Sequence, residues 1–145
     1  MEWTPKLSIG VDIIDSQHKE LFLKINELVT AIKDHTCKYK ITDVIRFLED
    51  YIVFHFAEEE DYMRRNDYPG YLWHKGQHDH FMENFMELKK ELQKLDGGRR
   101  PGSYDLSVMT NQVVVDWILE HIAQVDMRFG EFLSDSVRTG KFSAS

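Results

Sequence analysis

The sequence predicts an all-α protein, an up-down-up-down antiparallel four-helix bundle with an N-terminal arm. Apolar residues recur at helical spacing in four long segments, and no strand-like alternation of useful length competes with them. Only three prolines occur, and none of them interrupts a periodic segment. Amphipathic helices joined by short connections pack as antiparallel neighbours. We expect helices over about residues 12–36, 42–65, 71–95 and 103–134.

The first two helices are predicted from their apolar stripes and from a turn motif. Asp12 is a suitable N-cap for the first helix, whose stripe includes Ile14, Leu21 and Ile25. The second helix runs to the sequence NDYPG, where proline and glycine favour a turn. The third helix follows this turn directly. The glycine-rich sequence DGGRRPG at residues 96–102 separates the third helix from the fourth, and residues 1–145 are expected to form one domain.

Composition excludes several classes of protein. The net charge of −7 argues against a nucleic-acid or anionic membrane surface, so neither partner is expected. No apolar run of about 18 residues is present, and no export signal is visible at the N-terminus. Cys37 is the only cysteine, so an internal disulfide is impossible, and we expect it to be unreactive. These features predict a cytoplasmic protein.

Histidines occupy positions in the apolar stripes of all four helices. Because neighbouring helices alternate in direction, these positions converge at one end of the bundle. A buried polar group without a partner costs about 1–3 kcal/mol, so a core rich in imidazoles needs a ligand. The sequence therefore predicts a metal centre there. The five histidines are His18, His55, His74, His78 and His121.

Two acids are placed to complete this centre. In HFAEEEDYM, Glu59 lies four residues after His55 and therefore on the same helix face, which selects it as the inward acid. Glu58, Glu60 and Asp61 are expected to face mostly solvent. Asp126 lies five residues after His121, which is about 140° around a regular α-helix, so it is the weakest member on geometry.

The number of candidate ligands excludes a single structural zinc, which takes four. Five imidazoles and two carboxylates suit a pair of first-row ions bridged by carboxylates, and an imidazole-rich set favours iron. The paired Glu-x-x-His motif, H-E-x-x-H and C-x-x-C-H are all absent. A Ser/His/Asp triad stays open, although no G-x-S-x-G motif is present.

The segments DSQHKELF, HFAEEEDYM, HKGQH and WILEHIAQVD together resemble the hemerythrin family. They reproduce its pattern H…HxxxE…HxxxH…HxxxxD over nearly the whole chain. The resemblance implies two iron ions (Fe2+/Fe3+) with an oxo or hydroxo bridge and one vacant position for dioxygen. It assigns His74, His78 and His121 to one iron, His18 and His55 to the other, and Glu59 and Asp126 to both.

Apolar residues beside these ligands predict a dry pocket for dioxygen. Phe56 follows His55 directly, whereas Trp117, Ile118 and Ile122 lie within a turn of His121. The resemblance adds Trp3, which lies where family members tend to carry a tryptophan. We expect reversible oxygen binding rather than enzymatic activity, for storage, delivery to an oxygen-using enzyme, or scavenging. The alternatives are an oxygen or redox sensor acting on a separate partner, and a di-iron peroxidase or NO-handling enzyme.

Overall fold

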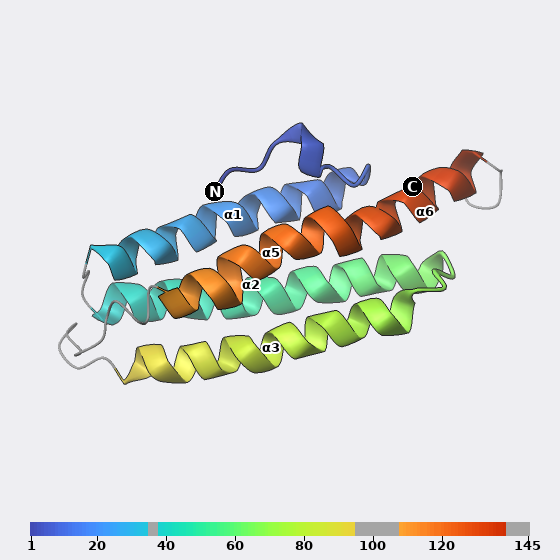
Figure 1. Cartoon of the computed structure of the whole chain (residues 1–145). Coiled ribbons are helices and arrows are strands. Elements are labelled where there is room, and N and C mark those ends of the chain that lie inside the picture. Colours follow the sequence, from blue (N-terminus) through green and yellow to red (C-terminus); the bar gives the residue numbers. More distant parts are fainter. Residues whose placement is uncertain (35–37, 95–107, 139–145) are drawn as a thin grey trace.

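The computed structural model describes residues 1–34, 38–94 and 108–138, which form four helical rods and an N-terminal arm (Figure 1). The first three rods are α1 (Asp12–Lys33), α2 (Lys38–Arg65) and α3 (Tyr71–Gln93). Residues 108–138 form the fourth rod, which contains η2 (Asn111–Asp116), α5 (Trp117–Glu120), η3 (His121–Asp126) and α6 (Met127–Arg138). The arm contains the short helix η1 (Pro5–Leu7) and lies beside α1. The predicted all-α, four-helix architecture is confirmed.

The helix ends differ slightly from those expected. Val11 is the N-cap of α1, so Asp12 is its first helical residue and not its cap. α2 begins at Lys38, before the expected start at Thr42, and α6 continues to Arg138. The expected helix ends at residues 36, 95 and 103 lie outside the described residues, as do Cys37 and the segment 96–102.

A tight turn joins α2 to α3 at the end of the bundle that carries the histidines. The backbone N–H of Tyr68 donates to the carbonyl of Met63 at 2.9 Å, which closes α2. Asp67 adopts a positive φ of 51°, a conformation that aspartate tolerates better than most residues. Because this short turn reverses the direction of the chain, the first turn of α3 packs beside the last part of α2, and His74 lies opposite Glu59.

In the part of the chain that the structure describes, two hydrophobic clusters form the core. The smaller contains Ile9, Ile14, Met63 and Phe129. The larger extends along all four rods and includes Leu21, Ile52, Phe85 and Val114. On α1, His18 lies between Ile14 of the smaller cluster and Leu21 of the larger one. Polar side chains at this level are therefore covered by apolar ones on two sides.

The arm is fastened to the bundle at both of its ends. The carboxylate of Asp15 accepts from the backbone N–H of Ile9 at 3.0 Å and from the hydroxyl of Ser8 at 2.5 Å. At the other end, the side-chain amide of Asn26 donates to the carbonyl of Met1 at 2.7 Å. Gly130 lies so close to Ile9 that a Cβ atom there would overlap the Ile9 carbonyl oxygen.

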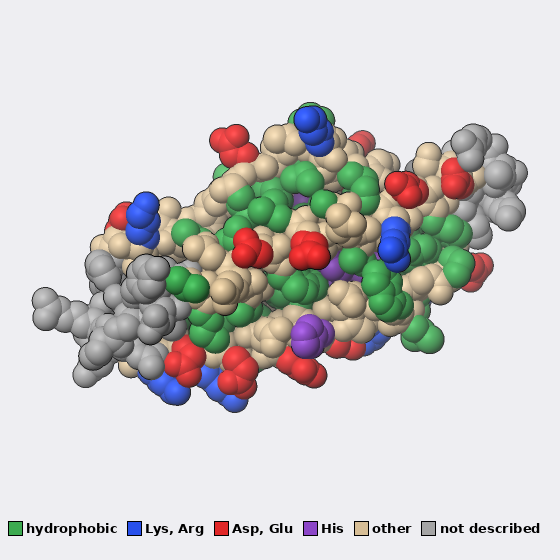
Figure 2. Space-filling model, in the orientation of Figure 1, with side chains coloured by type: hydrophobic (Ala, Val, Ile, Leu, Met, Phe, Trp, Pro, Cys, Tyr) green, Lys and Arg blue, Asp and Glu red, His purple; other side chains and the backbone are tan. Residues whose placement is uncertain are grey.

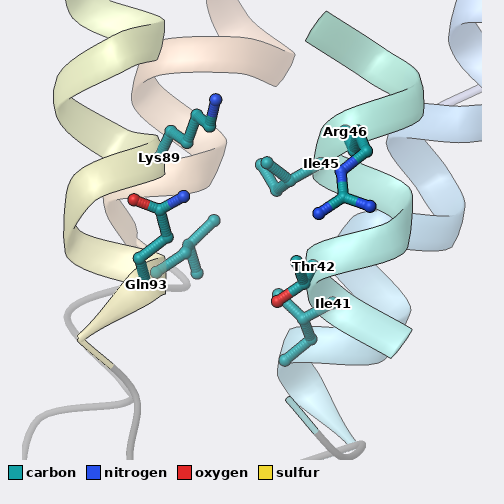
Figure 3. A pocket seen from close by; sticks show the side chains of 7 residues that line it. Ile41, Thr42, Ile45, Arg46, Lys89 and Gln93 are labelled. Carbon is teal, nitrogen blue, oxygen red and sulfur yellow. The ribbon is translucent and has the colours of Figure 1, made fainter. Parts of the chain in front are cut away.

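A small cavity of about 70 Å³ lies between the start of α2 and the end of α3 (Figure 3). Isoleucine and leucine side chains form part of its wall, and polar ones form the rest. Its lining residues are Ile41, Thr42, Ile45, Arg46, Lys89, Leu92 and Gln93. The cavity lies near the N-terminus of α2, whereas His55 and Glu59 lie in the second half of this helix, so the two sites are separate.

Charged side chains of both signs are scattered among hydrophobic ones on the face shown in Figure 2. Within the three described stretches of the chain, no helix is both long and apolar enough to cross a membrane.

Candidate metal centre

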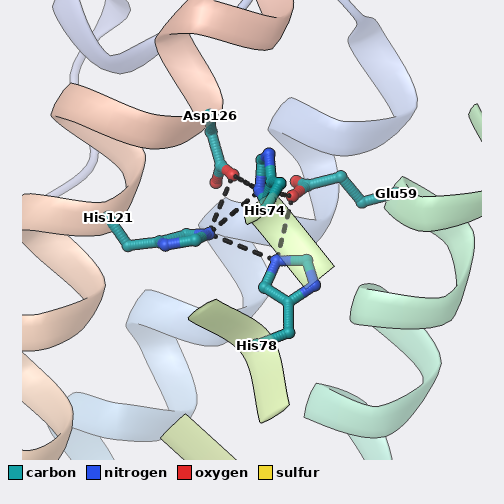
Figure 4. A group of neighbouring side chains, drawn as sticks. All are labelled: Glu59, His74, His78, His121 and Asp126. Carbon is teal, nitrogen blue, oxygen red and sulfur yellow. Dashed lines mark hydrogen bonds and ion pairs between the residues drawn. The ribbon is translucent and has the colours of Figure 1, made fainter. Parts of the chain in front are cut away.

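The structure brings all seven predicted side chains together in the interior of the bundle. Their ligand atoms form two groups, and within each group every atom lies within 4.8 Å of the others. The first group contains three histidines and the second contains two, and both include the same pair of carboxylates. The first group, drawn in Figure 4, is Glu59, His74, His78, His121 and Asp126; the second is His18, His55, Glu59 and Asp126.

The three-histidine group converges through its Nε2 atoms. His74 Nε2 lies 2.8 Å from Glu59 Oε1 and 2.9 Å from Asp126 Oδ1. His78 Nε2 lies 3.2 Å from Glu59 Oε1, and His121 Nε2 lies 3.0 Å from Asp126 Oδ1. His121 Nε2 is also 3.2 Å from the Nε2 atoms of both His74 and His78. Three ring nitrogens and two carboxylate oxygens therefore face one small volume.

The two-histidine group faces the other oxygen of each carboxylate. His18 Nε2 lies 3.1 Å from Asp126 Oδ2 and 3.7 Å from Glu59 Oε2, and His55 Nε2 lies 3.6 Å from Glu59 Oε2. Each carboxylate thus directs one oxygen at one group and its second oxygen at the other. This is the arrangement of a carboxylate that bridges two cations.

The inward atoms of the cluster are buried and lack conventional hydrogen bonds. Among the described residues, His18 Nε2 and all four carboxylate oxygens of Glu59 and Asp126 have no partner with hydrogen-bond geometry, despite the short separations. Leaving such groups unpaired in the interior costs about 1–3 kcal/mol each. Bound cations would satisfy all of them at once, so the donor set fits a pair of metal ions.

The electrostatics of the metal-free cluster point the same way. Burial alone lowers the pKa of His18 and His74, but the close carboxylates of Asp126 and Glu59 outweigh it and raise both pKa values to about 9. Burial lowers the pKa of His55 to about 3. Although burial opposes ionisation of Glu59 and Asp126, the surrounding imidazoles hold the pKa of each carboxyl below its usual range. Without a cation, protons on His18 and His74 neutralise the two carboxylates.

A π-helical segment in the fourth rod brings Asp126 into the cluster. The segment η3 begins at His121, ends at Asp126 and is π-helical, with hydrogen bonds that span five residues instead of four. The wider turn brings Asp126 back toward the line of His121, which a regular α-helix would leave about 140° away. The sequence-based view of Asp126 as the weakest member assumed a regular helix, and the structure removes that objection.

His80, two residues after His78 on α3, is exposed and contacts Asn84, so it lies outside the cluster. His35 lies outside the described residues.

Residues 9–133 match the model of the hemerythrin HHE cation-binding domain, which covers most of the chain. The chain belongs to the hemerythrin family.

Curated and solved members of the hemerythrin family resemble this chain along nearly its full length. A bacteriohemerythrin from Clostridium acetobutylicum is 32% identical over 133 residues, covering 88% of this chain and 96% of the relative. A bacteriohemerythrin from Methylococcus capsulatus is 30% identical over 135 residues, covering 92% and 97%. A crystal structure of wild-type hemerythrin gives a TM-score of 0.75 at 29% identity, covering 90% of this chain and 95% of that chain.

Apolar and aromatic side chains cover the hemerythrin-type cluster on the side of the larger core. The Trp117 ring stacks on His121, with centroids 4.3 Å apart and planes inclined by 12°. Phe56 stacks on His78, and Ile118 and Ile122 are buried in the same hydrophobic cluster.

Trp3 approaches from the arm and packs against the larger cluster. The ammonium group of Lys19, the residue after His18, lies 4.4 Å from the centre of its ring. The place of Trp3 in an oxygen pocket stays a prediction.

Among the described residues, two polar side chains that the helical periodicity did not identify contact the Nδ1 atoms of cluster histidines, which face away from the cluster. Gln17 Oε1 lies 2.8 Å from His55 Nδ1, and Glu60 Oε2 lies 2.8 Å from His78 Nδ1. The expectation that Glu60 faces mostly solvent is wrong, because only 13% of its side chain is exposed. Each residue directly adjoins a cluster residue in sequence, Gln17 before His18 and Glu60 after Glu59. That adjacency is the signal that could have identified them.

Proposed function

We propose that this protein holds two iron ions in the buried cluster and binds dioxygen reversibly there. The proposal rests on the difference between the two groups of ligand atoms, which share the same two carboxylates but contain different numbers of histidines. One group offers three imidazoles and two carboxylate oxygens, whereas the other offers two imidazoles and two carboxylate oxygens. A first-row ion in the second group is therefore one protein ligand short of its neighbour, which leaves a position for an external molecule.

In this proposal His74, His78 and His121 hold one iron, and His18 and His55 hold the other. Glu59 and Asp126 would bridge the pair, because each directs one oxygen at each group. The family resemblance adds an oxo or hydroxo bridge to this centre. When bound, two ferrous ions can supply two electrons to dioxygen and recover them on its release.

The surrounding side chains support reversible binding rather than turnover. Phe56, Ile118 and Ile122 are buried, and the ring of Trp117 covers His121. Such walls hinder the entry of water and anions that would promote oxidation of the metal pair. We therefore propose a role in oxygen storage, delivery to an oxygen-using enzyme, or scavenging.

The test is a cycle of oxygenation followed by absorption spectroscopy. The iron-loaded protein is reduced without air, exposed to oxygen, and then purged with argon while its visible charge-transfer bands are recorded. We expect two irons per chain and repeated return to the colourless form. Irreversible oxidation in the first cycle, or rapid consumption of added peroxide, would instead favour an enzymatic role.

A further inference from the structure

We propose that Glu60 is a positioning residue whose negative charge makes the three-histidine half of the centre the tighter cation site. This inference rests on the proposed dinuclear centre and concerns how its two halves differ. Its starting point is that each half has one histidine whose outer nitrogen is paired with a side chain. That partner is the carboxylate of Glu60 for His78 and the neutral amide of Gln17 for His55.

The contact between Glu60 and His78 is well defined. Because a carboxylate only accepts, the Nδ1–H of His78 donates to Glu60 Oε2 across 2.8 Å, which leaves Nε2 free to face the cluster. On the opposite side of the ring, Nε2 lies 3.2 Å from Glu59 Oε1. Adjacent residues of α2 therefore contact both nitrogens of one imidazole on α3.

The remaining histidines lack this arrangement. Among the described residues, the Nδ1 atoms of His18, His74 and His121 are buried without a hydrogen-bond partner. Glu60 is thus the one carboxylate seen to accept from an outer nitrogen in the described part of the cluster. A hydrogen bond to an ionised group is roughly twice as strong as one between neutral groups, and it makes the imidazole a better electron donor.

The effect of the Glu60 charge can be separated from the orientation of the His78 ring. The ring of Phe56 stacks on His78, with centroids 3.8 Å apart and planes inclined by 3°. This stack holds the plane of the imidazole independently of Glu60. Replacing the carboxylate by an amide should therefore remove the charge while largely preserving the ring orientation and an acceptor atom. The two halves differ in the same way, since Gln17 already gives His55 an amide acceptor.

The experiment titrates metal-free protein with Co2+, which avoids oxidation chemistry, and follows binding by calorimetry. At one equivalent, the paramagnetically shifted ring protons of the histidines identify the half that is occupied. In the wild-type protein we expect two steps, with the three-histidine half filled first. Glu60→Gln should weaken that step by roughly 10- to 100-fold and leave the other nearly unchanged. Glu58→Gln, which removes the same charge two residues earlier, should reproduce the wild-type isotherm.

Different failures are distinguishable. Fewer than two Co2+ ions bound by the wild-type protein would argue against the proposed dinuclear centre itself. If two bind but Glu60→Gln matches the wild type while Glu60→Ala loses affinity, Glu60 acts through its hydrogen bond alone and the inference is overturned. Equal weakening of both steps would overturn it as well. Gln17→Glu gives an independent check, because a carboxylate that accepts from His55 should reduce the difference in affinity between the two Co2+ binding steps. An unchanged difference in affinity contradicts the inference.

Discussion

The imidazole of His78 lies flat against the phenyl ring of Phe56, with ring centroids 3.8 Å apart and planes inclined by only 3°. Phe56 directly follows His55 in α2, and so consecutive residues contribute to different halves of the cluster. His55 belongs to the two-histidine group, whereas Phe56 supports a histidine of the other group. Phe56 therefore belongs to the apolar core and also contacts a histidine of the cluster.

Truncation of Phe56 should affect both stability and oxygen binding. Because Phe56 is buried, Phe56→Ala should lower the free energy of unfolding by about 3–5 kcal/mol. It should also shorten the lifetime of the oxygenated protein, because water gains access to the cluster. Denaturant unfolding and the decay of visible absorption measure these effects. Phe54→Ala on the exposed face of α2 should change stability by only about 0.5 kcal/mol, and a similar loss in both variants would contradict the lining role.

Removal of the bridging carboxylate of α2 should empty the centre. Each oxygen of Glu59 faces a different group of histidines, so Glu59→Ala removes a donor from both. We expect loss of most iron from the purified protein, measured by elemental analysis. Glu58→Ala removes the preceding acid and should retain two irons per chain. Equal iron loss in the two variants would show that Glu59 is not the inward bridging acid.

Cation binding should strengthen as the pH rises toward 9. The pKa values of His18 and His74 are raised from 6.5 to about 9 in the metal-free protein, so both rings carry protons at neutral pH. A cation must displace these protons. Calorimetry in two buffers with different ionisation enthalpies should detect proton release near pH 7.5 and its disappearance above about pH 9. Binding without proton release at pH 7.5 would contradict the raised pKa values.

The same groups determine how the stability of the metal-free protein depends on pH. Between pH 6.5 and about 9 the folded state binds more protons at His18 and His74 than the unfolded state does. The free energy of unfolding should therefore fall as the pH rises through this range. Loading with a redox-inert cation should abolish this trend, and urea unfolding at several pH values measures it. A metal-free protein that becomes more stable toward pH 9 would refute the assignment.

Substitution of Gly130 should loosen the N-terminal arm. A methyl group there would overlap the carbonyl oxygen of Ile9, so Gly130→Ala must displace either the arm or α6. We expect lower stability and faster hydrogen exchange of the Ile9 amide, which donates to Asp15. The control is Gly76→Ala in α3, where a Cβ atom meets nothing within 4 Å and should stabilise the helix by about 0.5–1 kcal/mol. Equal exchange rates at Ile9 in the Gly130 variant and the wild type would contradict the clash.

The periodicity of the sequence was sufficient to predict the four helices, the five histidines of the cluster and Glu59. Burying His18 or His74 among stripes of isoleucine and leucine costs free energy unless a partner is present, so their positions alone indicated a shared polar site. The spacing of His55 and Glu59 identified the inward acid for the same reason, because α-helical geometry places residues four apart on one face.

The sequence by itself therefore determined the features that depend on regular helical geometry. Tertiary packing decided the others. The π-helical turn between His121 and Asp126 is not visible in an apolar stripe, yet it brings the second carboxylate into line. Likewise, the sequence placed Glu60 on the outer face of α2, but the approach of α3 places His78 within 2.8 Å of it. Contacts between helices depend on their rotation and separation, and a periodic pattern specifies only which face of each helix is buried.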